Sequence, residues 1–187
     1  MDFNDIVGHE KVISNIQRSI DNGRISHSYL FEGPESIGKK KIAHVFAKTL
    51  LCPKKGISPC NSCASCIKVE SGNHPDLMFV EPEKGSIKKD QIEEVIKSTY
   101  TLPIEGDKKI YIIDDSHNMT IQAQNAFLKT LEEPPAHLNF ILISTNSKSL
   151  LPTIVSRCQV IKFFPVEEKK IIDFLMKIDI LGLKFMK

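Results

Sequence analysis

The chain has 187 residues, of which 41% are hydrophobic and 26% are charged, a composition typical of a folded globular protein with room for one full domain and the start of a second. Its formal net charge is only +2, so overall charge gives no support for tight nucleic-acid binding by the isolated chain. No apolar run reaches the roughly 20 residues that span a bilayer and the N-terminal residues lack the features of a signal peptide, so we expect a cytoplasmic protein with no membrane partner.

Apolar and amphipathic patterns alternate along the chain. Short apolar runs typical of strands buried on both faces occur at residues 28–31, 77–80, 109–114 and 139–145, with a shorter, similar run at 159–163. Apolar residues at helical spacing occur between these runs, at residues 39–51, 88–100 and 120–133. Pro134 and Pro135 end the last of these helices, because proline lacks an amide hydrogen and its ring blocks the preceding turn.

The alternation of strands and helices predicts an α/β fold with a mainly parallel, five-stranded sheet flanked by helices on both faces. In such sheets, ligands bind at the carboxyl ends of the strands. A last amphipathic pattern follows Pro165 and has no visible partner to pack against. We therefore predict a core domain at residues 1–165 and the start of a small helical domain, incomplete in this chain, at residues 166–187.

The sequence GPESIGKK at residues 33–40 is close to the phosphate-loop pattern G-x-x-x-x-G-K-[ST]. Gly33, Gly38 and Lys39 match the pattern, and the stretch follows a predicted strand and precedes a predicted helix. Backbone amides of such a turn and of the helix start point at phosphate oxygens, with the lysine as counter-charge. A nucleotide-binding loop is therefore expected here.

Two features of the predicted loop argue against magnesium-dependent ATP hydrolysis. Lys40 stands where the pattern requires a hydroxyl group, and an ammonium group has no lone pair with which to bind a metal ion. The acidic partner at the end of a neighbouring strand is Asp114 followed by Asp115, where an ATPase of this type usually has glutamate as the second acid. The shorter Asp115 would place an attacking water poorly, so bound ATP and magnesium are weakly supported.

Four of the five cysteines lie within fifteen residues, at Cys52, Cys60, Cys63 and Cys66. Zinc prefers four thiolates in a tetrahedron, and Cys-x-x-Cys turns present two sulfur atoms to one ion without strain. Four protein ligands leave no open coordination position. The spacing therefore predicts a structural, not a catalytic, zinc site in an insert at about residues 52–66.

Two alternatives to zinc stay open at this point. Cys-x-x-Cys-x-x-Cys also occurs in iron–sulfur proteins, which would make the chain a redox protein, and the four thiols can also simply be reduced residues of a loop. The fifth cysteine, Cys158, is expected to be a buried apolar side chain. His74 and His117 have no nucleophile or metal ligand beside them in the sequence, so we assign them no catalytic role and expect solvated or capping groups.

A set of motifs extends over residues 1–165. The motifs, in chain order, are IVGH, SYLFEGPESIGK, the four-cysteine insert, GNHPDL, SIKKDQI, IYIIDDSHNMT, NAFLKTLEEPP, NFILIST and SRC. Together they resemble bacterial clamp-loader subunits of the AAA+ class. Within this class HPDL, SIKKDQI and Lys40 are most similar to the delta-prime type of DNA polymerase III, because active gamma/tau subunits keep the hydroxyl that Lys40 replaces. The resemblance implies a zinc-bearing AAA+ core, a small lid domain and a helical collar domain.

The resemblance also implies roles for residues outside the phosphate loop. In clamp loaders the arginine of the SRC motif reaches into the ATP site of a neighbouring subunit, so Arg157 is expected to act in trans, on a neighbour's ATP. Two other nucleotide contacts are implied. Thr145 and Asn146 fall at the sensor position near the γ-phosphate, and Ile6, Val7 and Gly8 fall where the family contacts adenine.

By this resemblance the chain is a stator and arginine donor in the ATP-driven loading of a sliding clamp onto primed DNA, without ATPase activity of its own. The implied partners are gamma/tau and delta subunits, with the sliding clamp and primer–template DNA reached through the complex, and the isolated chain is expected to be a monomer. Two further functions stay open. One is an active clamp-loader ATPase of the gamma/tau type, and the other is a zinc-stabilised DNA-binding or scaffold module with no nucleotide role.

Overall fold

The computed structural model describes residues 1–184, with side-chain environments through residue 176. The strands are β1 (Ser28–Glu32), β2 (Leu77–Val80), β3 (Lys109–Ile113), β4 (Leu138–Ser144) and β5 (Gln159–Lys162). The α-helices are α1 (Glu10–Asp21), α2 (Lys39–Leu51), α3 (Ala64–Glu70), α4 (Lys89–Thr99), α5 (Ile121–Glu132), α6 (Pro152–Val155) and α7 (Glu168–Lys184). Short 3-10 helices are η1 (Phe3–Asp5), η2 (Ser116–Asn118) and η3 (Ser147–Ser149).

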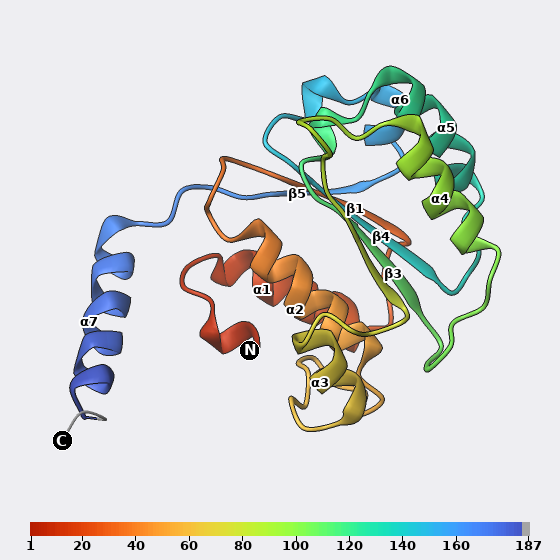
Figure 1. Cartoon of the computed structure of the whole chain (residues 1–187). Helices are drawn as coiled ribbons and strands as arrows, with labels where there is room; N and C mark the ends of the chain where they lie inside the picture. Colours follow the sequence, from red (N-terminus) through yellow and green to blue (C-terminus); the bar gives the residue numbers. More distant parts are fainter. Residues whose placement is uncertain (185–187) are drawn as a thin grey trace.

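Within residues 1–184 the five strands form one parallel sheet in the order β2-β3-β4-β1-β5. Helices cover both faces, with α1, α2 and α3 on one side and α4, α5 and α6 on the other (Figure 1). Successive residues of β4 alternate between the two resulting cores: Ile141 packs with Phe46 of α2, and Phe140 packs with Phe127 of α5. The predicted α/β fold with a parallel five-stranded sheet is confirmed.

The central strands β1, β3 and β4 are buried on both faces, as their continuous apolar sequences predict. The same prediction is wrong for β2 and β5, which form the two edges of the sheet. Met78 and Phe79 of β2 are 39% and 37% exposed, and Val160 of β5 is 37% exposed. An edge strand has one strand neighbour instead of two, so part of its apolar surface stays uncovered.

Helix α7 lies apart from the sheet, at the end of an extended segment that leaves β5 (Figure 1). Its Lys170 donates to Glu10 of α1 at 2.8 Å, while Leu175 and Met176 are 53% and 59% exposed. The predicted helix after Pro165 is confirmed as an element, and residues 185–187 of the predicted second domain lie outside the described residues. None of the helices in the described part of the chain is long and apolar enough to cross a membrane.

Candidate functional site

The predicted phosphate loop connects β1 to α2. Gly38 immediately precedes α2 with φ of 98°, a left-handed conformation that other residues rarely adopt. At Gly33 the constraint is spatial, because an added Cβ would lie 2.5 Å from the carbonyl oxygen of Phe163. The backbone therefore requires both glycines of the pattern, whether or not a phosphate binds.

Lys39 is folded over this loop. Its Nζ donates to the carbonyl oxygens of Gly33 at 2.6 Å and Pro34 at 2.5 Å, and the residue is only 6% exposed. Burial lowers the pKa of Lys39, and the nearby carboxylates of Asp115 and Asp114 oppose that effect. A phosphate group entering the loop would compete with these two carbonyl oxygens for the ammonium group.

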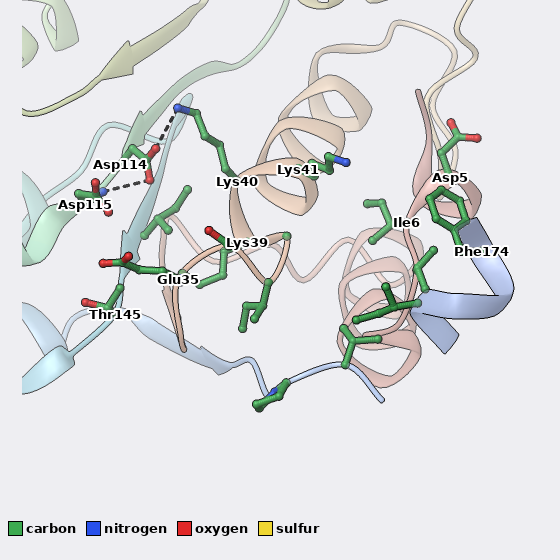
Figure 2. Close-up of a pocket in the computed structure, with 18 residues that line it drawn as sticks. Asp5, Ile6, Glu35, Lys39, Lys40, Lys41, Asp114, Asp115, Thr145 and Phe174 are labelled. Carbon is green, nitrogen blue, oxygen red and sulfur yellow. Dashed lines mark hydrogen bonds and ion pairs between the residues drawn. The ribbon is translucent and has the colours of Figure 1, made fainter. Parts of the chain in front are cut away.

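Lys40 is bound to two carboxylates. Its Nζ lies 2.9 Å from Asp114 Oδ2 and also donates to Glu81 Oε1, and Figure 2 shows the side chain reaching from α2 toward Asp114. The hydrogen bond to Glu81 is the main cause of a raised pKa for Lys40, and Asp114 adds to it. An ammonium group thus occupies the side of Asp114 that faces α2, where the phosphate-loop pattern would place a hydroxyl group.

Glu81 was missed by the sequence analysis. It directly follows β2, and the Asp114 amide donates to the Val80 carbonyl at 2.9 Å, so both acids stand at the carboxyl ends of adjacent strands. The signal in the sequence was present, because an acidic residue directly after a parallel strand is expected at the same sheet edge as other strand-end residues. Asp115 beside them has φ of 45°, an uncommon conformation for a residue with a side chain.

A cavity of about 840 Å³ opens in front of the loop and brings most of the predicted nucleotide residues together. The predicted residues that line it are Ile6, Val7, Gly38, Lys39, Lys40, Asp114, Asp115 and Thr145. The charged groups of Lys40, Asp114 and Asp115 gather at one end, and Ile6 and Phe174 lie at the other (Figure 2). The cavity therefore has a charged end beside the phosphate loop, where carboxylates and lysines lie together, and an apolar end.

Three predicted residues do not line the cavity. Gly33 packs against Phe163, and Gly8 has φ of 75° with an added Cβ placed 2.7 Å from Val166. Asn146 caps η3, accepting a hydrogen bond from the Lys148 amide at 3.0 Å. All three shape the backbone around the cavity. Additional lining residues that the sequence analysis did not name are Asp5, Glu35, Ser36, Ile37, Lys41, Ile143, Pro165, Val166, Ile171 and Phe174.

Arg157 stands outside this cavity, two residues after α6. Its Nη1 donates to the carbonyl oxygen of Thr153 at 2.7 Å and its Nη2 donates to Glu132 Oε1 at 2.6 Å. The side chain is 31% exposed. Arg157 is thus fixed at the surface and separated from the phosphate loop of its own chain.

The four predicted cysteine ligands form one cluster, with all Sγ atoms within 4.8 Å of one another. The Cys52–Cys63 and Cys60–Cys66 sulfur separations are 4.0 and 3.9 Å. These values are close to the roughly 3.8 Å between sulfur atoms that share a tetrahedral zinc ion, and about twice the length of a disulfide bond. The cysteine cluster therefore fits a single zinc ion held by four thiolates.

The environment of the cysteine cluster favours thiolates at its exposed side. Backbone hydrogen bonding from Ser62 is the main cause that lowers the pKa of Cys60 to about 5, while burial raises the pKa of Cys66 to about 12. Cys63 caps α3 and accepts a hydrogen bond from the Cys66 amide at 3.4 Å. A bound cation would stabilise all four thiolates, which would contribute folding energy to the insert. Burial also raises the pKa of Cys158 to about 12. The side chain packs against the core but is only partly buried, so the expected full burial is met in part.

His74 and Asp76 join the cysteine insert to the sheet. The Nδ1 of His74 accepts from the Asp76 amide at 3.1 Å, and its Nε2 lies 3.0 Å from the Ser65 hydroxyl, which donates to Leu51. Asp76 is fully buried and accepts from the amides of residues 104 and 105. His74 is 5% exposed and accepts from the backbone two residues on, so of the two expected positions, solvated or capping, it has the capping one.

Comparison with known proteins identifies the family of this chain. A family model described as "DNA polymerase III, delta subunit" matches residues 8–167. The chain belongs to this clamp-loader family. A curated relative, the DNA polymerase III subunit delta′ of Bacillus subtilis strain 168, is 42% identical over 170 residues, which cover 91% of this chain and 52% of the relative.

Other subunits of DNA polymerase III are nearly as similar to this clamp-loader family member. The gamma subunit of Buchnera aphidicola subsp. Baizongia pistaciae is 39% identical over 178 residues, covering 94% of this chain and 48% of the relative. The chain spans about half the length of these curated relatives. Identity therefore assigns the clamp-loader family but does not separate delta′ from gamma.

Solved structures agree with this assignment. A DNA polymerase III gamma subunit-related protein of Thermotoga maritima has a TM-score of 0.61 and 25% identity, covering 84% of this chain and 47% of that protein. A RuvB variant of the same organism has a TM-score of 0.62 at 15% identity, covering 95% of this chain and 52% of RuvB. The second likeness shows the AAA+ fold alone.

Proposed function

We propose that this clamp-loader subunit is of the delta-prime type: a stator that does not itself hydrolyse ATP and that donates Arg157 to the ATP site of a neighbouring subunit. Its partners are then gamma/tau and delta subunits, with the sliding clamp and primer–template DNA reached through the assembled complex in the cytoplasm. Residues 1–165 are the AAA+ core in this proposal, and the segment from residue 166 begins the lid. The 42% identity to a delta′ subunit supports it.

The ion pair between Lys40 and Asp114 is the observation that carries the proposal. Magnesium bound between a nucleotide and the strand-end acids needs a hydroxyl ligand from the loop and an available carboxylate. Here Lys40 Nζ lies 2.9 Å from Asp114 Oδ2, so the ammonium group of a side chain already neutralises this carboxylate. A second cation at this position would be repelled by the ammonium group, so the residues around the loop disfavour magnesium-dependent hydrolysis.

The position of Arg157 supports the trans role. Arginine stabilises charge on a transferred phosphoryl group only when its guanidinium contacts that group. Arg157 does not line the cavity of its own chain, and its side chain is 31% exposed. These observations support the proposal that the ligand of Arg157 is the nucleotide of a neighbouring subunit.

In this proposal the cysteine cluster holds one zinc ion with Cys52, Cys60, Cys63 and Cys66, which would supply rigidity and no chemistry because no coordination position is left open. The chain's own residues do the rest. Helix α2 starts at the phosphate loop and ends next to Cys52, and His74 ties the insert to the sheet through Ser65. A stator needs this stiffness, because it must resist movements that ATP drives in its neighbours.

A gamma/tau-type ATPase is the second candidate function. The cavity in front of the loop favours it, because Lys39 and Thr145 line a space of about 840 Å³ with a charged end and an apolar end. The 39% identity to a gamma subunit points the same way. This candidate requires Lys40 to leave Asp114 when magnesium and ATP bind.

Calorimetric titration of the chain with ATP, with and without magnesium, followed by phosphate release on the same sample, separates the two functions. The proposed function predicts no phosphate release and no gain in affinity for ATP when magnesium is added. Magnesium-dependent binding with steady phosphate release would assign the chain to the gamma/tau type instead. The same titration with Lys39→Ala, which removes the loop lysine, shows whether any measured heat is due to ATP binding in the cavity in front of the loop.

A further inference from the structure

We infer that Glu132 is a positioning residue that holds the guanidinium group of Arg157 ready for an anionic ligand on a neighbouring subunit; this inference rests on the trans role proposed for Arg157. The two side chains come from different elements, Glu132 from the last residue of α5 and Arg157 from the segment after α6. They meet at 2.6 Å between Arg157 Nη2 and Glu132 Oε1.

The contacts of Arg157 orient its guanidinium group and use only part of its N–H donors. Arginine has five N–H donors, of which one on Nη1 binds the Thr153 carbonyl at 2.7 Å and one on Nη2 binds Glu132. Two acceptors fix the plane of the guanidinium group, and within the described residues the remaining donors have no protein acceptor. A phosphate group presented from outside can therefore bind to a guanidinium whose orientation is already set.

The support beneath Glu132 is rigid. It ends α5 directly before Glu133 and the Pro134–Pro135 pair, so its backbone has little freedom. Gln124, earlier on α5, accepts from the Leu151 amide at 2.7 Å and donates to the Ser149 carbonyl at 3.2 Å. These bonds fix the segment that leads into α6. The backbone that carries the Glu132 carboxylate is thus held in place relative to the segment that carries Arg157.

The exposure of the pair indicates positioning and not stabilisation of the fold. Arg157 and Glu132 are 31% and 47% exposed, and ion pairs at that exposure contribute little to folding stability because water competes for both charges. Orientation of a catalytic group has larger effects, since a misplacement of about 1 Å can cost about a hundredfold in rate. Removing Glu132 is therefore expected to change the rate much more than the stability.

A competing role for Glu132 predicts the opposite sign. If the carboxylate mainly withheld Arg157 from phosphate, its removal would raise the rate. The free donors of Arg157 argue against that role, because phosphate need not displace Glu132 to bind. The sign of the rate change in a variant therefore decides between positioning and competition.

The first experiment measures the Arg157 guanidinium by nitrogen NMR in the isolated chain. Three variants are compared: Glu132→Ala removes the acceptor, Glu132→Gln keeps an oxygen acceptor without the charge, and Glu133→Gln changes a neighbouring exposed charge that makes no side-chain hydrogen bond within the described residues. We expect faster guanidinium motion in Glu132→Ala alone, with the unfolding midpoint unchanged. Equal motion in Glu132→Ala and the unmodified chain would overturn the inference.

The second experiment measures ATP hydrolysis by a clamp loader assembled with this protein and stimulated by clamp and primed DNA. We expect Glu132→Ala to lower kcat about tenfold with KM within about twofold, and Glu132→Gln and Glu133→Gln to keep most of the activity. Arg157→Ala should lower kcat by about 10³ or more. A lower kcat with a nearly unchanged KM is expected when a contact made in the transition state becomes less well ordered but is not removed.

The outcomes separate the two levels of the proposal. A large loss in Arg157→Ala together with an unchanged or increased kcat in Glu132→Ala overturns the positioning role and leaves the proposed function standing. An equal loss in Glu132→Ala and Glu133→Gln also overturns it, because net charge would then explain both. An unchanged kcat in Arg157→Ala overturns the proposed trans role itself.

Discussion

Lys40→Thr converts the loop to the sequence GPESIGKT and removes the two ion pairs at the strand ends. Lys40 is 51% exposed, and its partners Asp114 and Glu81 are 16% and 58% exposed. Pairs of this exposure contribute about 0.2–1 kcal/mol each. We therefore expect the free energy of unfolding to fall by about 1 kcal/mol, which lowers Tm by about 2–4 °C for a chain of this size.

Magnesium and ATP should more than restore this loss in Lys40→Thr. The threonine hydroxyl and the released Asp114 carboxylate provide the two ligands that the ion pair otherwise prevents. A ligand present at a hundred times its Kd stabilises the fold by about 2.7 kcal/mol, so Tm should rise by several degrees above that of the variant without ligand. The measurement is thermal unfolding with ATP, with magnesium and with both.

Lys41→Thr is the matched control, because Lys41 lines the same cavity and makes no ion pair within the described residues. It should show the same response to magnesium as the unmodified chain. The reasoning is refuted if Lys40→Thr and Lys41→Thr respond alike, or if the unmodified chain already binds ATP more tightly when magnesium is added. Either result would mean that the Lys40–Asp114 pair does not exclude the metal.

Three further results are expected for the insert and its attachment to the sheet. The purified chain should contain one zinc ion by elemental analysis. Cys60→Ser should lose the zinc ion and Cys158→Ser should keep it. Loss of zinc from both variants, or its retention in both, would contradict the four-thiolate site. Asp76→Ala should lower the free energy of unfolding by about 1–3 kcal/mol, because it removes a buried carboxylate that accepts hydrogen bonds from the amides of residues 104 and 105. A loss below about 0.5 kcal/mol in denaturant titration would argue against that role. Burial lowers the pKa of His74, so the unfolded chain binds this proton more readily and stability should fall as pH drops below about 6.5. His74→Asn should reduce that fall relative to the unmodified chain, and identical pH profiles would refute it.

The sheet was predictable from sequence because its central strands are continuously apolar. The same rule failed at the edges, since sequence does not state how many neighbours a strand has: Phe79 is as apolar as Phe140, yet one is 37% exposed and the other is fully buried. Strand order, which decides burial, follows from crossover connections and not from local pattern. Helices α2, α4 and α5 were predicted to within a residue or two, because apolar residues at helical spacing mark them. Helices α1, α3 and α6 were not predicted.

The site was predictable where a motif fixes the backbone and not where distant residues meet. Gly38 and Lys39 are found from the loop pattern itself. Glu81 and Glu132 were missed, since each pairs with a cation 41 or 25 residues away in sequence, Lys40 or Arg157. Charged residues of that kind look like ordinary surface groups until the fold places them beside a cation.

Helix α2 begins at the phosphate loop and ends at Leu51, directly before the first cysteine of the cluster. Its 13 residues give a length of about 20 Å, with each residue turned by about 100° from the last. One inserted residue would swing Cys52 around the helix axis and out of reach of the other three sulfur atoms, or would force the loop lysine away from its carbonyl partners. The length of this helix is therefore fixed from both ends, so we expect insertions and deletions to be tolerated in surface loops but not between Gly38 and Cys52.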